Sequence, residues 1–298
     1  MTYHIPVLAE TAIDGLNIYP EGVYVDVTFG GGGHSRLIFD RLTKGQLAAF
    51  DRDPDAQANL IQSDRFHFFP NNYRFTYNFL DFAKLLPVDG ILADLGVSSH
   101  QFDEAERGFS FRFDAELDLR MSKNSGQTAA DILNNYPENQ LIHIFSAYGE
   151  VKNSRTLAAK IISERSIKPI MTTSDLVSAI EKFTPAHSRH KYLAQVFQAL
   201  RIEVNAELDS LKEFLLQTPS MLKKGGRLVI ISYHSLEDRL VKNFLKTGNL
   251  EGRETKDFYG NPQSPFRLIT RKPIQADDLE IEKNNRARSA RLRIAELI

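Results

Sequence analysis

The 298-residue chain contains no cysteine. This absence excludes a disulfide framework and any zinc site built on thiolates. It also disfavours enzymes that act on ring carbon 5 of a pyrimidine, because these generally activate the ring with a cysteine nucleophile. The chemistry of the chain must therefore rest on other side chains.

Long apolar runs and a strong net charge are missing as well. No stretch approaches the roughly 18 consecutive apolar residues that a membrane span requires. Residues 1–7 lack the basic start and apolar run of a secretion signal, so we expect a cytoplasmic protein with no membrane partner. The formal net charge is −1, which argues against bulk attraction to nucleic acid. Any contact with RNA would need local basic patches.

Short apolar segments with strand character alternate with helical segments near both ends of the chain. The expected strands are residues 24–29, 46–50, 90–93, 226–232, 266–270 and 290–295, and a helix is expected at 35–42. Apolar strands separated by helices are typical of strands buried on both faces. The pattern predicts an α/β fold with a parallel, doubly wound sheet.

Helical periodicity replaces this alternation in the middle of the chain. The expected helices are residues 129–134, 138–147, 154–164 and 174–183, followed by one long helix at 196–216. Thr172 and Thr173 stand where a helix N-cap belongs. We therefore predict a sheet domain made of residues 1–103 and 196–298, interrupted by a helical domain at 104–195.

A run of four glycines, Gly30 to Gly33, follows the first strand and opens a helix. Without a Cβ, such a loop lets the backbone approach a ligand closely. Asp51 ends the next strand, where an acidic side chain can bind both hydroxyls of a ribose. Together these features predict a site for a nucleoside cofactor.

Two details favour S-adenosylmethionine over a nicotinamide dinucleotide. The dinucleotide pattern G-x-G-x-x-G would need a third glycine where this chain has Ser35. Asp94 ends a later strand, where many methyltransferases present a polar residue to the transferred methyl group. A nicotinamide-dependent oxidoreductase, which NAD would stabilise, and a non-catalytic RNA-binding factor, which would not need the loop, remain the alternatives.

Several further blocks extend the pattern over the rest of the chain. They are residues 94–99 (DLGVSS), 107–111 (RGFSF), 117–121 (LDLRM), 197–205 (FQALRIEVN), 231–239 (ISYHSLEDR) and 286–293 (RARSARLR). With them the chain resembles the bacterial 16S rRNA cytosine-N4 methyltransferases of the RsmH/MraW type over essentially its whole length. The resemblance implies a Rossmann-like class I methyltransferase sheet domain with an inserted α-helical domain for substrate recognition.

The resemblance also implies an activity and a set of ligands. The activity is methylation of the exocyclic N4 amine of a cytidine in the decoding region of 16S rRNA, within the assembled small subunit and without a metal. It is compatible with a homodimer. The residues that it implies at the S-adenosylmethionine site are Gly32, Gly33, His34, Asp51, Tyr73, Asp94 and Gln101. One segment departs from the family, because residues 190–195 read HKYLAQ where relatives commonly show HPATR.

The candidates for catalysis are Asp94 and His234. An amine conjugated to a ring needs a hydrogen-bond acceptor for its N–H and must lose a proton. Asp94 could act as that acceptor and take up the proton. The alternative is that Asp94 only holds the cofactor. His234 follows a strand that should end on the ligand side of the sheet. It could face the base or relay a proton, or serve only as a structural hydrogen-bonding residue, and Tyr233 could stack on the base.

Basic residues gather near the C-terminus and in one central helix. They are Arg286, Arg288, Arg291 and Arg293, and Lys152, Arg155, Lys160 and Arg165. If Ala290, Leu292 and Ile294 face the core, Arg291 and Arg293 share the opposite face of a strand. We expect the C-terminal arginines to contact phosphate, the alternative being a solvated edge. The basic residues of the central helix could likewise contact RNA or form a solvated helix surface.

Overall fold

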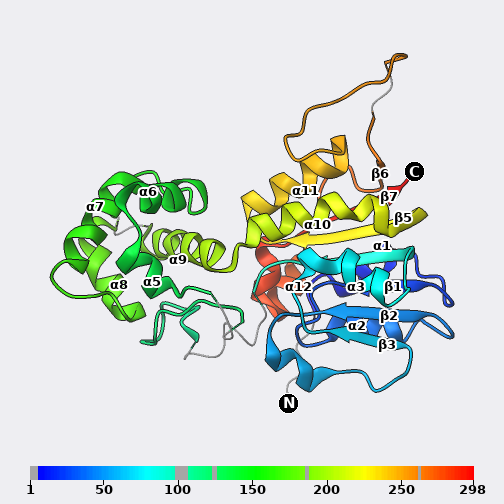
Figure 1. Cartoon of the computed structure of the whole chain (residues 1–298), viewed down its shortest axis with the longest axis horizontal. Coiled ribbons are helices and arrows are strands. Elements are labelled where there is room, and N and C mark those ends of the chain that lie inside the picture. The colour runs from blue at the N-terminus through cyan, green and yellow to red at the C-terminus, as the bar shows by residue number, and fades with distance from the viewer. Residues whose placement is uncertain (1–5, 98–106, 123–125, 185–187, 261–262) are drawn as a thin grey trace. The chain divides into compact units, whose positions relative to one another are not determined.

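The computed structural model describes residues 6–97, 107–122, 126–184, 188–260 and 263–298 (Figure 1). The chain divides into two compact units, Met1–Gly96 with Leu208–Ile298, and Val97–Glu207. The first unit carries a β-sheet and the second is helical. No helix within the described residues is both long enough and apolar enough to cross a membrane.

The sheet has seven strands in the order β3-β2-β1-β4-β5-β7-β6. They are β1 Val23–Asp26, β2 Gln46–Phe50, β3 Phe66–Phe69, β4 Val88–Asp94, β5 Leu222–Ser232, β6 Phe266–Leu268 and β7 Arg291–Leu297. Strands β1 to β5 are parallel, whereas β7 runs antiparallel to both β5 and β6. The predicted parallel sheet is therefore right for five strands and wrong for the last two. Antiparallel strands need no crossover helix, so the alternation of strand and helix gives no guide there.

Helices cover both faces of the sheet, which explains the unbroken apolar strands. On one face Val25, Ile91 and Leu228 pack in a core with side chains of three helices, α3 Thr76–Phe82, α10 Glu207–Met221 and α11 Ser235–Thr247. On the other face Tyr24 and Leu92 pack with side chains of α1 Ala9–Leu16 and α2 Gly33–Phe39. Neighbouring strand residues thus point alternately into two separate cores.

The second unit has its own core. Its helices are α5 Ala129–Asn135, α6 Glu138–Ala147, α7 Ser154–Arg165, α8 Thr173–Ile180 and α9 Arg189–Asn205. Phe145, Leu157 and Leu200 are buried among them. Thr172 caps α8 by accepting a hydrogen bond from the Asp175 backbone, which confirms one of the two predicted caps, while Thr173 is already helical. Among the described residues of this unit, none belongs to a strand of the sheet.

The single helix predicted at 196–216 is wrong. Helix α9 ends because Ala206 has a left-handed φ of 46°, and α10 begins at Glu207. The Glu207 carboxylate accepts two hydrogen bonds from Arg201, at 2.8 and 3.0 Å. The units change at Gly96/Val97 and at Glu207/Leu208, whereas the sequence predicted 103/104 and 195/196.

The segment that departs from the family lies at the start of α9. Tyr192 and Leu193 are buried there. The Tyr192 hydroxyl donates to Asn153 Oδ1 at 3.1 Å. The segment therefore packs within the helical unit.

Candidate active site

Three aspartates lie at the carboxyl-terminal edge of adjacent parallel strands. Asp26 ends β1, Asp94 ends β4, and Asp51 follows β2 directly. Strand β1 lies between β2 and β4, so residues far apart in sequence reach one edge of the sheet. Between β1 and β4 the strand order changes direction, and open α/β sheets bind their ligands at this point.

The glycine run follows β1 and opens α2. Gly32 is the N-cap of α2 with a φ of 76°, and a Cβ on it would lie 3.0 Å from the Phe29 ring. A Cβ on Gly33 would lie 3.1 Å from Pro6, whereas a Cβ on Gly31 would meet no atom within 4 Å. Glycine is thus required at 32 by conformation, while at 31 it leaves room beside the backbone. The N–H groups of the first turn of α2 favour negative charge there.

Asp51 shapes this loop. Its Oδ2 accepts a hydrogen bond from the Gly30 backbone at 2.7 Å, and its Oδ1 accepts one from the Asp53 backbone at 2.8 Å. Each carboxylate oxygen has a second lone pair that could accept a ribose hydroxyl. Burial raises the pKa of Asp51 to about 6. The sequence prediction assigned Asp51 only to ribose binding and missed its role in shaping the loop.

Asp26 joins the end of β1 to α2. Its side chain is buried and accepts hydrogen bonds from the Ser35 hydroxyl at 2.7 Å and from the Thr28 backbone at 3.1 Å. Burial raises its pKa. The Thr28 hydroxyl in turn accepts from the Asp94 backbone at 2.7 Å. The motif Asp26-x-Thr28 thus links two strand ends, a function that was not predicted.

Asp94 lies among residues from three elements. Its Oδ1 accepts a hydrogen bond from the Tyr233 hydroxyl at 2.7 Å, and its Oδ2 lies 3.7 Å from His34 Nδ1. Burial raises the pKa of Asp94 to about 6, although the neighbouring His34 and the Tyr233 hydroxyl act in the opposite direction. The structure therefore brings two predicted site residues, Asp94 and His34, face to face.

His34 is buried near the start of α2, and its partners define where its protons lie. Nε2 lies 3.0 Å from the Val7 carbonyl oxygen, which can only accept, so Nε2 carries a proton. Nδ1, which faces Asp94, is then protonated only in the imidazolium form. In the neutral ring Nδ1 is therefore an acceptor that faces the Asp94 carboxylate.

Tyr233 and His234 connect β5 to α11. The Tyr233 ring lies beside Gly96, where an added Cβ would be 3.4 Å from the ring. Burial, and then the charge of Asp94, raise the pKa of Tyr233 well above its ordinary value, so its hydroxyl stays a donor. The Tyr233 hydroxyl is directed to Asp94, and stacking of its ring on a base stays a prediction.

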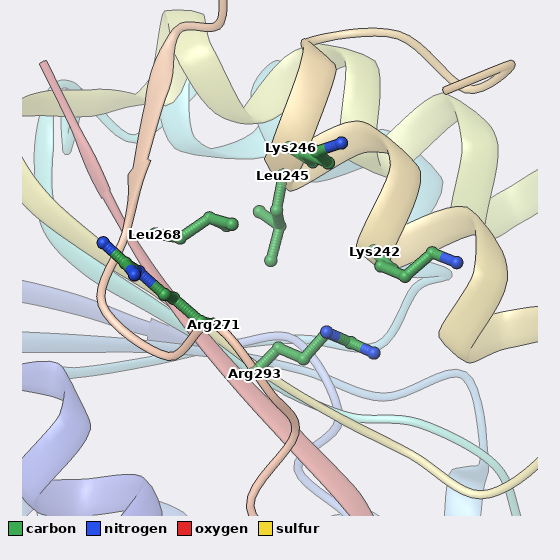
Figure 2. A pocket seen from close by; sticks show the side chains of 6 residues that line it. All are labelled: Lys242, Leu245, Lys246, Leu268, Arg271 and Arg293. Carbon is green, nitrogen blue, oxygen red and sulfur yellow. The ribbon is translucent and has the colours of Figure 1, made fainter. Parts of the chain in front are cut away.

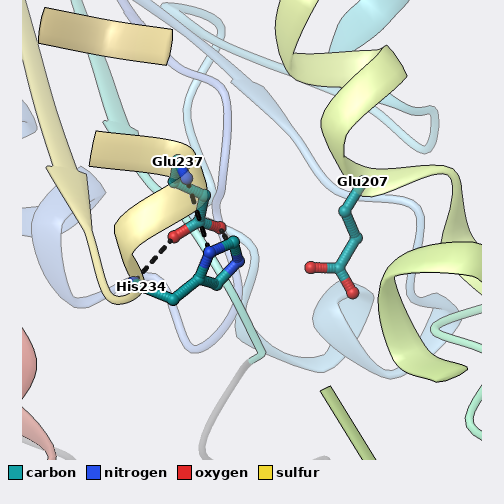
Figure 3. A group of neighbouring side chains, drawn as sticks. All are labelled: Glu207, His234 and Glu237. Carbon is teal, nitrogen blue, oxygen red and sulfur yellow. Dashed lines mark hydrogen bonds and ion pairs between the residues drawn. The ribbon is translucent and has the colours of Figure 1, made fainter. Parts of the chain in front are cut away.

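His234 caps α11. Its Nδ1 accepts from the Glu237 backbone at 3.4 Å, while the Glu237 carboxylate accepts from the His234 backbone (Figure 3). With Nδ1 accepting, the ring proton lies on Nε2. That atom is buried and lies 3.3 Å from Glu237 Oε1, without hydrogen-bond geometry to any described group. A buried N–H without a hydrogen-bond acceptor is suited to donate a hydrogen bond to a ligand.

Two further residues are implied at the cofactor site, Tyr73 and Gln101. Tyr73 begins the short 3₁₀ helix η2, Tyr73–Phe75, after β3, and its ring packs edge-on against Phe214 with centroids 5.6 Å apart. Gln101, like the polar pair Ser98 and Ser99, lies outside the described residues.

Arg291 and Arg293 lie as the strand pattern predicts, on β7. Ala290, Leu292 and Ile294 are buried in the core of one face. On the other face Arg293 donates to Asp238 of α11 at 2.7 and 3.2 Å, and Arg291 donates to it at 3.1 Å. The ion pair gives Arg293 a structural role, and phosphate contact stays a prediction.

Of the four basic residues in and just before the central helix α7, two bind groups of the helical unit and two are exposed. Arg165 donates to the carbonyls of Leu133 and Tyr136, both at 2.7 Å, and Lys160 pairs with Glu164. Lys152 and Arg155 are exposed. The first two cations therefore stabilise the helical unit itself.

A glycine loop, a strand-end acid suited to a ribose and a further carboxylate two strands away are typical of an α/β enzyme that binds a nucleoside cofactor. The model of the MraW methylase family matches residues 1–298. The chain belongs to this family.

Curated relatives agree over the full length. The chain is 55% identical to ribosomal RNA small subunit methyltransferase H of Bacteroides thetaiotaomicron, covering 99% of this chain and 98% of that one. It is 56% identical to the protein of the same name from Flavobacterium johnsoniae, covering 100% and 99%.

Solved structures are much less similar. An rRNA methylase from Streptococcus thermophilus matches with 14% identity, a TM-score of 0.41 and 99% coverage of both chains. SMU.1697c from Streptococcus mutans, solved in complex with SAH, matches with 13% identity, a TM-score of 0.43, and 99% and 100% coverage. Scores at this level carry no argument about the site.

Proposed function

We propose that this protein transfers a methyl group from S-adenosylmethionine to the exocyclic N4 amine of a cytidine in the decoding region of 16S rRNA. The observation that carries the proposal is the 55% identity, over nearly the whole chain, to proteins named ribosomal RNA small subunit methyltransferase H. We further propose that it acts on the assembled small subunit in the cytoplasm. A homodimer stays a prediction.

The residues at the strand ends fit this cofactor. S-adenosylmethionine supplies an electrophilic methyl group on a positively charged sulfur. Open space beside Gly31 admits a ligand against the backbone. Asp51 retains lone pairs for a ribose, and the negative charge of an ionised Asp94 favours a positive charge nearby. The residues proposed to bind the cofactor are Gly32, Gly33, His34, Asp51, Tyr73, Asp94 and Gln101.

Asp94 is the proposed proton acceptor. An ionised Asp94 would accept the N–H of the amine, which makes the nitrogen lone pair more available, and would then receive the proton. The Tyr233 hydroxyl orients the carboxylate, and His34 can take the proton onward through Nδ1. His234 Nε2–H is the proposed donor to an acceptor atom of the base.

The proposal is tested by mapping modified nucleosides in small-subunit rRNA. Purified protein, labelled S-adenosylmethionine and small subunits from cells lacking the gene should yield N4-methylcytidine at one position of the decoding region. The matched control is the Asp94→Asn variant under the same conditions. A product of 5-methylcytidine, or methylation of protein alone, would contradict the proposal.

A further inference from the structure

A pocket of about 340 Å³ opens on the sheet unit between α11 and the antiparallel strands (Figure 2). Its lining residues are Lys242, Leu245, Lys246, Leu268, Arg271 and Arg293. Four of the six are cations and none is acidic, although the whole chain has a formal charge of −1. The positive charge at this pocket is therefore local.

Only part of this charge is neutralised. Asp238 forms ion pairs with both Arg291 and Arg293, and Glu254 forms one with Lys246 at 2.7 Å. Burial alone would raise the pKa of Asp238, but the hydrogen bonds and charges of the two arginines hold it below its ordinary value. Asp238 therefore stays ionised and keeps Arg293 in place.

Lys242 and Arg271 make no ion pair or hydrogen bond with the described part of the chain. In Figure 2 the Lys242 and Arg293 side chains lie on one side of the pocket, while the Arg271 guanidinium lies on the other side, past Leu268. Leu245 and Leu268 face each other between them. An apolar floor between uncompensated cations suits a sugar carrying a phosphate on either side.

The pocket lies on the same face of the sheet as the arginines next to the strand-end site. Arg291 pairs with Ser232, the last residue of β5, directly before Tyr233. Arg293 pairs with Ile230, two residues farther from that edge, and lines the pocket. The two arginines thus lead from the strand-end site to the pocket.

The segment that joins α11 to β6 adds exposed aromatic rings. Phe258 and Tyr259 are 96% and 86% exposed, and their rings pack edge-to-face with centroids 5.6 Å apart. Exposed aromatic rings are typical stacking partners for unpaired bases.

We propose that this pocket binds the sugar-phosphate backbone of the rRNA beside the target cytidine. The proposal rests on the proposed function, because it takes rRNA as the ligand. Lys242 and Arg271 are the phosphate ligands, and the ion pair with Asp238 holds the Arg293 guanidinium in the pocket wall. The contact recognises the backbone and supplies affinity without reading sequence.

The test compares two double variants that remove the same charge. Lys242→Gln with Arg271→Gln changes the pocket, whereas Lys84→Gln with Lys224→Gln changes exposed lysines near the amino-terminal ends of β4 and β5. Binding to small subunits, and to an rRNA fragment spanning the decoding region, is measured across a salt series. Binding of S-adenosylmethionine is measured by calorimetry as a check on folding.

For the pocket variant we expect weaker binding and a plot of log K against log salt that is shallower by about 1.4, at about 0.7 for each phosphate lost on single-stranded RNA. We expect the control pair to match wild type and all proteins to bind S-adenosylmethionine equally. Equal slopes for wild type and the pocket variant, or equal losses for both double variants, would overturn the proposal. So would binding of inorganic phosphate to the pocket without any change in RNA affinity.

Failure of the proposed function gives a different result. Wild-type protein would then form no N4-methylcytidine at all. A wrong pocket assignment would leave wild-type methylation intact and the pocket variant indistinguishable from its control.

Discussion

Asp94 and Asp238 are both aspartates of the sheet unit with side chains only 23% and 10% exposed, but their surroundings differ. Asp238 is held by Arg291 and Arg293, and its pKa lies below its ordinary value. Asp94 has a tyrosine hydroxyl and a histidine ring instead, and burial raises its pKa to about 6. A buried carboxylate with a full set of cations stabilises the fold, whereas one without them is typical of a functional site.

The largest expected effect separates the two residues by activity. Asp94→Asn keeps the shape and can still accept from Tyr233, but it cannot take a proton from the amine. We expect turnover to fall by about 100-fold or more, with a much smaller change in affinity for S-adenosylmethionine. Single-turnover kinetics and calorimetry measure the two quantities. If both fall in proportion, Asp94 is only a cofactor ligand.

Asp238→Asn should act on stability instead. The substitution leaves Arg293 buried with a neutral partner, which should lower the free energy of unfolding by about 2–4 kcal/mol. Urea denaturation measures the change, and Asp64→Asn, at an exposed site, is the matched control. A loss of turnover in folded Asp238→Asn protein as large as that of Asp94→Asn would remove the contrast between the two aspartates.

His234 tests whether a second group at the strand ends contacts the base. Asparagine also caps helices, so His234→Asn should retain the start of α11 while removing the Nε2 donor. We expect about a tenfold loss of turnover, the value of one hydrogen bond, with little change in stability. Unchanged turnover with a melting temperature equal to wild type would leave His234 with capping alone.

The smallest effect is a pH dependence of stability. Because the pKa of Asp94 is about 6 in the folded chain and its ordinary value is 3.8, the folded state binds the proton more tightly. The resulting stability is present below the ordinary pKa and is lost as the pH rises through about 6. Between pH 5 and pH 7.5, without the cofactor, the free energy of unfolding of wild type should therefore fall by about 1 kcal/mol relative to that of Asp94→Asn.

Urea denaturation at the two pH values measures this change. Asp238→Asn should show no such change relative to wild type, because the arginines hold the pKa of Asp238 below its ordinary value of 3.8 and its stabilisation is already complete at pH 5. Parallel pH profiles for the two variants would mean that the two carboxylates do not differ as described.

The strand ends were the most predictable part of the molecule. Each carries a local signal, a glycine run or an acid directly after an apolar strand, and β2 was predicted with its observed bounds. Strand β3 was missed, although its sequence FHFF is aromatic, because all four of its residues are only half-buried and it has no following acid. The break between α9 and α10 was missed because it depends on one left-handed residue, Ala206, where sequence gives no glycine.

The sequence by itself determined the family, the sheet with its helical insertion, and the positions of Asp51 and Asp94 at strand ends. Chain-local patterns suffice for these, because strand periodicity and glycine loops are properties of neighbouring residues. Only the tertiary structure decided that Tyr233 and His34 meet Asp94, and that Asp238 takes up the arginines predicted to meet phosphate. Those partners lie 139 and 60 residues from Asp94, and 53 and 55 residues from Asp238, in sequence. Their contacts, and the pKa values that follow from them, exist only once the strands have paired and the surroundings are dry.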